Sequence, residues 1–258
     1  VAAHTATALL ARGQVDIGLV TTNVSYHAWA GQEAFEGNKV DNRLLFVYSP
    51  APQNVVVRAD SNVKTLADLA GKRFNPGLKG SATEKTAEAV FKTLGIAPDY
   101  VRGSTTDIVN QIKDNRVIGY VKSGAGNKLD GSSLDIATFT KVAVLSLTPE
   151  QKKLLADKMP DISVVDIPAG AAEGLPAYST WNFGLAVSAR PELSEETAYQ
   201  IAKAVFEDET VQVGALSSLK GLDLMKLTLE TGTIPLHPGV VRYMKEKGAT
   251  IPDKLMPK

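Results

Sequence analysis

The 258-residue sequence predicts an α/β fold built as two lobes. Strand-like and helix-like segments alternate along most of the chain, which is typical of α/β architecture. Residues 12–22 resemble residues 115–123, and each stretch reads as a helix end, a turn, a short strand and a small polar loop. Chance similarity between two short apolar strands is the alternative explanation. Because the chain contains no low-complexity or linker-like segment, we expect crossing strands to join the two lobes.

The first third of the chain supplies the elements in a regular order. A helix opens the sequence, with apolar residues at helical spacing at Ala2, Ala3, Ala6, Leu9 and Leu10. A short helix is expected from the cap candidates at 21–23 to about Gly31, and a further helix after the capping-box pattern Thr65-x-x-Asp68, ended by Gly71. Strands are expected at 15–20, at 44–48 with a stop at Ser49-Pro50, at 54–58 and at 73–75.

Capping signals mark the helices of the remaining chain. Ser81-x-x-Glu84 is a capping box, an apolar helix face follows it, and Gly95 ends that helix. Ser104-x-x-Asp107 repeats the pattern, and a looser match at Ser194 precedes another helix. Further strands are expected at 117–121 and 183–188, and a final helix at 240–247.

Composition excludes several classes of protein. The chain carries 28 basic and 28 acidic residues, so a broad nucleic-acid or anionic-membrane surface is not expected. It has no cysteine, which excludes disulfides and thiol chemistry. No apolar run approaches the length of about 18 residues that a transmembrane helix needs. No signal peptide is visible, and the opening helix lacks a cap, so we expect sequence upstream of Val1.

The loop Pro76–Thr83 is the strongest candidate for ligand binding. It leads into a helix N-terminus, where free N–H groups and the helix dipole favour an anion. Gly77 and Gly80 allow the backbone to approach closely, Ser81 and Thr83 add hydroxyls, and Lys79 adds a positive charge. Ordinary helix capping is the alternative interpretation. The same two interpretations apply to Thr21-Thr22-Asn23, whereas Gly124-Ala125-Gly126 indicates a loop where a ligand meets backbone.

Catalytic and metal-binding patterns are missing from the sequence. The three histidines, His4, His27 and His237, are scattered without metal-ligand spacing. There is no G-x-S-x-G elbow. Ser217-x-x-Lys220 matches S-x-x-K, but the accompanying S-D-N and K-T-G motifs are absent, so the match reads as a helix-surface coincidence. We therefore expect a binding protein with no catalytic residues, no metal and no cofactor.

An ordered set of segments resembles the TAXI-type solute receptors of TRAP transporters. The resemblance covers nearly the whole chain and includes the strand-to-loop segment 15–23 followed by Tyr26, the D-L-x-G-K-R element within 66–73, and Gly80-Ser81-Ala82-Thr83-Glu84, which is similar to the family's G-S-G-T-E loop. The segments 54–61, 123–126 and 167–170 also match. The family's usual opening strand and glycine-rich loop are not present, and Ala82 stands where the family has glycine.

The resemblance implies a type II periplasmic-binding fold that closes around a carboxylate-bearing solute, either glutamate-like or a 2-oxoacid or dicarboxylate. It also implies an extracytoplasmic location and delivery to TRAP-type membrane permease subunits, and we expect a monomer that binds no nucleic acid. The lobe boundaries it implies are 1–57 for the first part of lobe I, 58–180 for lobe II and 181–258 for the second part of lobe I.

Site residues carry over by position. From lobe I come Thr22, Asn23 and Tyr26, with Tyr48 near the hinge; from lobe II come Ser81, Ala82, Thr83, Gly124 and Ala125; and at the return crossing come Thr180, Trp181 and Asn182. An aromatic side chain gives a large contact area at low entropic cost, so Trp181 is expected to line the pocket, with a core position at a strand start as the alternative.

Three other functions use related folds. An ABC-type binding protein would serve another permease, and only transport assays or neighbouring genes would separate the two. A ligand-sensing domain of a transcription regulator would follow a DNA-binding helix-turn-helix. An enzyme on the same fold is disfavoured by the lack of cysteine and of clustered histidine.

Overall fold

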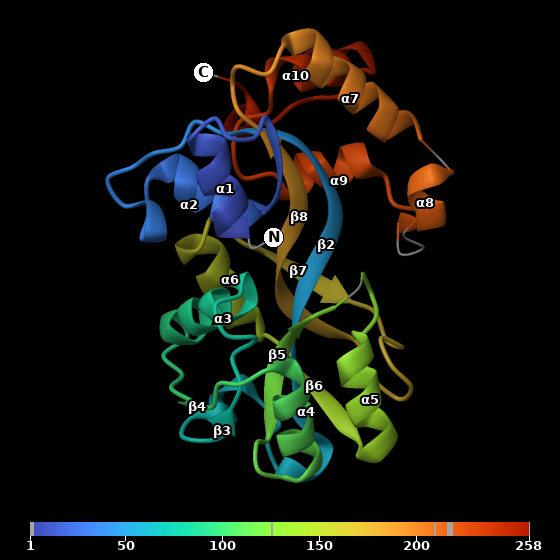
Figure 1. Ribbon diagram of the computed structural model, residues 1–258. Helices are drawn as coiled ribbons and strands as arrows, with labels where there is room; N and C mark the ends of the chain where they lie inside the picture. Colours follow the sequence, from blue (N-terminus) through green and yellow to red (C-terminus); the bar gives the residue numbers. More distant parts are fainter. Residues whose placement is uncertain (1–2, 125, 209, 216–218, 258) are drawn as a thin grey trace. The chain divides into compact units, whose positions relative to one another are not determined.

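The structure is a computed structural model that describes residues 3–124, 126–208, 210–215 and 219–257 (Figure 1). It divides the chain into unit 1, made of Val1–Pro50 and Phe183–Lys258, and unit 2, made of Ala51–Asn182. The chain leaves unit 1 within strand β2 (Arg43–Arg58) and returns within strand β8 (Tyr178–Ala189). The expected crossing in strands is therefore how the two units are connected.

In unit 1, helices pack against the parts of the two strands that belong to this unit, which are residues 43–50 of β2 and 183–189 of β8. Strand β1 (Ile17–Thr21) pairs antiparallel with β8, and a Cβ atom on Gly184 would lie 2.7 Å from Val47 Cγ1, so β2 and β8 are neighbours here. The core joins β2 and β8 to the C-terminal helices through Leu44, Leu236 and Met244. The helices are α1 (Ala3–Ala11), α2 (Thr22–Ala30), α7 (Glu195–Glu207), α8 (Val211–Ala215), α9 (Leu224–Thr231) and α10 (Pro238–Glu246).

Unit 2 is built around the β-branched run at the end of β2. β5 (Gly119–Ser123) and β6 (Val142–Leu145) both pair antiparallel with this part of β2, and β7 (Ser163–Ile167) pairs with the start of β8. β3 (Arg73–Phe74) pairs in parallel with β4 (Asp99–Tyr100) and bonds to β5 through Asn75. The helices are α3 (Ala82–Thr93), α4 (Thr105–Lys113), α5 (Gly131–Phe139) and α6 (Pro149–Lys158).

Helices cover both faces of the unit 2 sheet. Val55 and Val57 face the cluster that contains Phe91 of α3 and Leu155 of α6. Val56 faces the opposite cluster, which contains residues of α4 and α5. Alternation along a strand explains why three consecutive valines are all buried, and each contributes roughly 1.5–3 kcal/mol of burial free energy.

The internal similarity corresponds to one helix–turn–strand unit in each half. In unit 1, α1 leads through Gly13 (φ 64°) into β1; in unit 2, α4 leads through Asn115 (φ 57°) into β5. Both turns place a left-handed residue where glycine or asparagine is favoured. The helix-start predictions at Ser81, Ser104 and Ser194 are also confirmed, because each hydroxyl accepts the N–H three residues later. The Thr65–Asp68 capping box forms as well, but it begins only a 3₁₀ turn, Leu66–Leu69.

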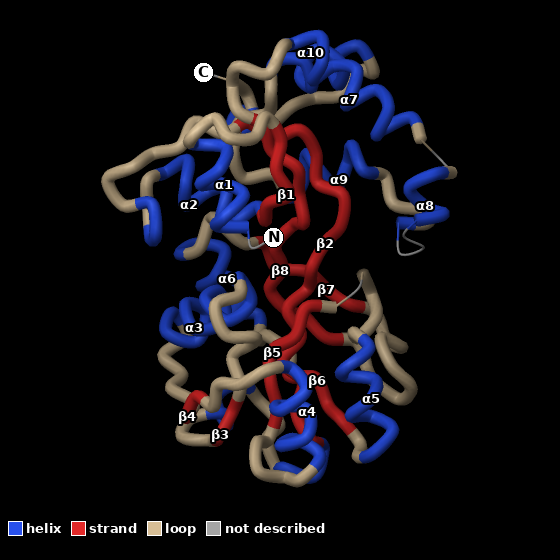
Figure 2. Tube along the Cα trace, in the orientation of Figure 1, coloured by secondary structure: helices blue, strands red, loops and turns tan. Residues whose placement is uncertain are grey.

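The expected break at Ser49-Pro50 is wrong, because β2 continues through it for 16 residues (Figure 2). Proline has no N–H to donate to a ladder, and here side chains bond the neighbouring backbone groups. The N–H of Ala51 donates to Asn182 Oδ1 at 2.8 Å, and Ser49 Oγ donates to Pro50 O at 3.0 Å. The first unit boundary accordingly lies between Pro50 and Ala51, because the strand residues that follow pair with β5 and β6 of unit 2.

Candidate functional site

The loop that precedes α3 lies against the first turn of that helix. Ser81 Oγ accepts the N–H of Glu84 at 3.1 Å, as the capping box predicts. The Glu84 carboxylate reaches one residue further upstream than expected, where Oε2 accepts the N–H of Gly80 at 2.5 Å. Gly77 (φ 135°) is required here, since a Cβ atom would stand 2.8 Å from the N atom of Glu84. Sequence-local hydrogen bonds therefore fix the backbone ahead of the helix.

The first turn of α3 retains donors that can meet a ligand. The first four N–H groups of a helix have no partner four residues back. At the start of α3, the N–H of Ser81 donates to Leu78 O at 2.9 Å, and the N–H of Glu84 donates to Ser81 Oγ. Among the described residues, this leaves the N–H groups of Ala82 and Thr83, both half-buried. Lys79 is exposed in the same loop.

A hydroxyl pair beside this turn carries a further donor. Thr83 Oγ1 lies 3.1 Å from Ser123 Oγ at the end of β5, and Ser123 Oγ accepts from Gln53 Nε2 at 2.9 Å. Two hydroxyl protons are present, and the Thr83–Ser123 bond uses one of them in either direction. Among the contacts of the described residues, one O–H therefore stays available to an acceptor at the start of α3.

Gln53 forms the wall behind these hydroxyls. Its side chain is fully buried, and Nε2 also donates to Ala51 O at 2.6 Å, which fixes the orientation of the amide. The other amide atom, Oε1, is buried without a hydrogen-bond partner among the described residues. A buried acceptor left unpaired costs about 1–3 kcal/mol, so this position is where a ligand or a water donor would be stabilising.

Close packing explains why position 124 is a glycine, which the sequence alone did not reveal. A Cβ atom there would stand 2.6 Å from Asn54 Nδ2 and 2.9 Å from the carbonyl oxygen of Lys128. Asn54 Oδ1 in turn accepts the hydroxyl of Tyr178 at 2.8 Å, and burial raises the pKa of Tyr178 to about 12. The close backbone approach expected of Gly124 is thus made to the protein itself, while Ala125 lies outside the described residues.

Residues 180–182 of β8, where the chain returns to unit 1, are buried and do not line the site. Thr180 Oγ1 donates to the carbonyl oxygen of Gln53, and Asn182 bonds Ala51 N and Ser163 Oγ. Trp181 is 0% exposed and packs edge-on against Phe91, 5.9 Å between ring centroids, inside the core of unit 2. The expectation that Trp181 lines a pocket is corrected by this burial; the alternative of a core tryptophan at a strand describes it.

In unit 1, three of the predicted residues, Thr22, Asn23 and Tyr26, belong to α2, and Tyr48 belongs to β2. Thr22 is buried and accepts the N–H of Gly184 at 2.9 Å, and its carbonyl oxygen accepts from Thr233 at 2.6 Å. Asn23 is buried in the same turn. Tyr26 is half-buried, with its ring 6.4 Å from Trp29. Tyr48 belongs to the half-buried edge of the unit 1 core, where burial raises the pKa of its hydroxyl.

The sequence analysis missed two polar side chains, Gln53 in β2 and Ser25 in α2. Gln53 follows Pro52 and precedes an apolar strand, and a lone amide in that place could have signalled a buried polar role. Ser25 lies one turn after Thr21, and both hydroxyls are buried without a hydrogen-bond partner among the described residues. A serine at this spacing from a predicted helix cap is the signal that was available.

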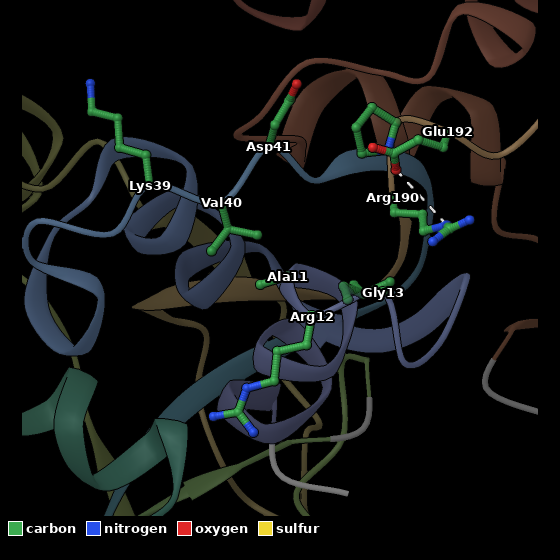
Figure 3. A pocket seen from close by; sticks show the side chains of 10 residues that line it. Ala11, Arg12, Gly13, Lys39, Val40, Asp41, Arg190 and Glu192 are labelled. Atoms are coloured by element: carbon green, nitrogen blue, oxygen red, sulfur yellow. Dashed lines mark ion pairs between the residues drawn. The ribbon is translucent and has the colours of Figure 1, made fainter.

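Unit 1 also has a hollow of about 390 Å³ between α1, the loop before β2 and the end of β8 (Figure 3). Val40 and Ala11 border it, while Arg12 and Lys39 extend away from each other. Arg190 is held by Asp16 at 2.8 Å and by Glu192 at 3.8 Å. Polar groups do not converge on this hollow in Figure 3, and none of the predicted site residues lines it.

Metal ligands do not gather within the part of the chain that the structure describes: no group of three or more His, Cys, Asp or Glu side chains could hold an ion. Among the described helices, none combines the length and the apolarity that crossing a membrane requires. His237 is a helix cap, since Nδ1 accepts the N–H of Gly239 at 3.3 Å and Nε2 lies 2.9 Å from Leu193 O.

Comparison with solved structures identifies the fold. Rpa4515 of R. palustris with adipate is 16% identical, with 94% of this chain and 81% of that chain covered and a TM-score of 0.52. XAC2383 of Xanthomonas citri bound to chloride ion is 13% identical, with 95% and 80% covered and a TM-score of 0.52. The periplasmic aliphatic sulphonate binding protein SsuA of Escherichia coli is 15% identical, with 97% and 67% covered and a TM-score of 0.43. The two structures with a TM-score of 0.52 support the mixed α/β fold of type II periplasmic binding proteins for this chain.

The family assignment comes from the sequence itself. The pattern that defines the NMT1-like family matches residues 2–248, which is nearly the whole chain. The match includes both crossings between the units and the start of α3. The chain therefore belongs to the NMT1-like family.

Proposed function

We propose that this protein binds a small organic carboxylate reversibly and without chemical change, with one carboxylate group held at the start of α3. The observation that carries the proposal is the group of donors there: the N–H groups of Ala82 and Thr83 and the spare O–H of the Thr83–Ser123 pair. The buried Oε1 of Gln53, linked to this pair through Ser123, is a second and independent polar group at the same place.

The electrostatics of the helix start suit an anion. A helix N-terminus stabilises a nearby negative charge by about 0.3–1 kcal/mol at an exposed position and up to about 2 kcal/mol when partly buried. A hydrogen bond to a charged group contributes about 1.5–3 kcal/mol. Three such bonds give roughly 5–9 kcal/mol, and association costs about 4–15 kcal/mol. A carboxylate alone would bind weakly, so the ligand must have further groups that bind elsewhere on the protein.

The choice of ligand class follows from this requirement. Adipate and chloride, which accompany two solved proteins of similar fold, are both anions. Together with the sequence resemblance to receptors of glutamate-like and 2-oxoacid ligands, they make glutamate, 2-oxoglutarate and adipate the first probes. Gln53 Oε1 would accept a hydrogen bond from the ammonium group of glutamate, whereas 2-oxoglutarate and adipate carry no donor for it.

The partner and the compartment belong to the same proposal. The sequence resembles TAXI-type receptors, so we propose that the protein works outside the cytoplasmic membrane and delivers its ligand to a TRAP-type permease. Transport into proteoliposomes that contain the candidate permease, with and without the purified protein, tests this step. Uptake that needs ATP would instead identify an ABC-type system.

The binding step is tested by calorimetry with the three carboxylates, with adipamide as the neutral control. Saturable binding of at least one carboxylate and none of adipamide is expected. Ser81→Asp adds a negative charge at the helix cap and should lower carboxylate affinity by tenfold or more, which corresponds to about 1.4 kcal/mol. Unchanged affinity in this variant would place the carboxylate elsewhere, and product detected by mass spectrometry in excess of protein would refute a pure binding role.

A further inference from the structure

Two tethers hold the loop ahead of α3, and both end on the short segment that follows β4. At one end of the loop, Asn75 Oδ1 accepts the N–H of Gly77 at 3.0 Å, while Asn75 Nδ2 donates to Val101 O at 2.8 Å. At the other end, Glu84 Oε2 accepts the N–H of Gly80, and Glu84 Oε1 accepts from Arg102 Nε at 2.9 Å. Residues 101–102 therefore anchor the loop at its beginning and at its end.

Glu84 is the sensitive member of this arrangement. Its side chain is buried, at 6% residue exposure, and Arg102 is the cation that the structure pairs with it. A buried carboxylate that loses its cation is strongly destabilised, so the bond from the Gly80 N–H to Glu84 should weaken when the positive charge beside it is removed. Glu84 also carries a negative charge in the helix turn where the proposed ligand places another.

Arg102 is itself held in position. Its Nη2 bonds Glu88 Oε1 on the next turn of α3, and its guanidinium group lies 5.6 Å from the ring centroid of Tyr100. The fork of the guanidinium thus joins two carboxylates of one helix, as arginine does better than lysine. The side chain is partly exposed, at 43%, so the pair can be changed from the surface.

We propose that Arg102 is a positioning residue for the carboxylate site: it fixes the loop through Glu84 and neutralises the charge of Glu84 beside the ligand. The inference rests on the proposed function for its effect on ligand affinity. Its effect on the loop does not depend on a ligand. Arg102 does not touch the ligand in this account, because it acts through the Glu84 carboxylate and the Gly80 N–H.

Removing both charges of the Arg102–Glu84 pair distinguishes a positioning role of Arg102 from a general loss of stability. Arg102→Met removes the cation and keeps a long apolar stem, and Glu84→Gln keeps an oxygen for the Gly80 N–H but removes the negative charge. The double variant should therefore recover what Arg102→Met loses. Arg102→Lys keeps the charge, and Arg116→Met, which breaks an exposed pair with Asp114, is the matched control.

Two measurements test the proposal: hydrogen exchange of the Gly80 amide without ligand, and calorimetry with adipate. In Arg102→Met, exchange of Gly80 should be faster and adipate affinity should be lower, each roughly tenfold, as expected for a weakened bond to a charged group. Arg102→Lys, the double variant and Arg116→Met should stay within about threefold of wild type.

Wild-type exchange and affinity in Arg102→Met would overturn the proposal, and so would an equal loss in the double variant. If the wild-type protein binds no adipate, the affinities are measured with glutamate or 2-oxoglutarate. If it binds none of the three, that result counts against the proposed function, and the exchange of the Gly80 amide then decides the role of Arg102 by itself.

Discussion

Gly124→Ala distinguishes packing from ligand approach at the end of β5. The added Cβ atom would stand 2.6 Å from Asn54 Nδ2 and 2.9 Å from Lys128 O, whereas ordinary contacts begin at 3.4 Å. The Asn54 amide would have to move by about 0.8 Å, which would weaken its 2.8 Å bond from the Tyr178 hydroxyl. Overpacking costs about 1–3 kcal/mol and the bond about 1 kcal/mol, so we expect a loss of about 2–4 kcal/mol.

Thermal unfolding followed by circular dichroism measures this loss. For a chain of this size, 1 kcal/mol lowers Tm by roughly 2–4 °C, so Gly124→Ala should lower Tm by roughly 5–15 °C. Gly131→Ala is the matched control, because nothing lies within 4 Å of its added Cβ atom and its φ is not positive. A wild-type Tm in Gly124→Ala with a lower ligand affinity would refute the packing argument and restore the interpretation of Gly124 as a ligand-facing glycine.

Three other perturbations follow from the structure. Gly119→Ala would place a Cβ atom 2.2 Å from the carbonyl oxygen of Val56, which is backbone and cannot turn aside, so we expect a larger loss of stability than in Gly124→Ala, measured by urea unfolding. Burial lowers the pKa of His237 below 6.5, so the unfolded chain takes up the proton first and stability should fall as pH decreases through 6.5; His237→Asn keeps a cap and should flatten this dependence. Burial raises the pKa of Tyr120 from 10.0 to about 12, so the unfolded chain loses the proton first and stability should fall between pH 10 and 12, less steeply in Tyr120→Phe. If His237→Asn or Tyr120→Phe shows the same dependence of stability on pH as the wild type, that residue does not cause the dependence.

Local patterns predicted the elements whose bonds are local. The start of α3 follows from Ser81 and Glu84, which act within one helix turn, and the turns at Gly13 and Asn115 need only a left-handed backbone conformation. The loop and its donors could therefore be predicted from residues 76–84 alone. The upstream reach of Glu84 to Gly80 could not, because it depends on Arg102 taking the other carboxylate oxygen.

The remaining errors come from contacts between distant segments. Trp181 became a core residue because β8 brings it against Phe91 of α3, a neighbour that no sequence window contains. Gln53 acquired its role from Thr180, which lies 127 positions away, and from Ser123. The break expected at Pro50 is absent because Asn182 satisfies the next N–H from a strand that returns much later in the chain. Polarity and strand propensity do not carry this information.

The most direct test of the account is the amide spectrum of the α3 start during a titration with the carboxylate that binds best in calorimetry. We expect the amide proton resonances of Ala82 and Thr83 to shift downfield as hydrogen bonds to the carboxylate form, with a midpoint that matches the calorimetric Kd. The amide resonance of Lys158, an exposed residue at the C-terminal end of α6, should not move. Calorimetric binding that leaves the Ala82 and Thr83 resonances in place would contradict the central claim, because the carboxylate would then be bound somewhere other than the start of α3.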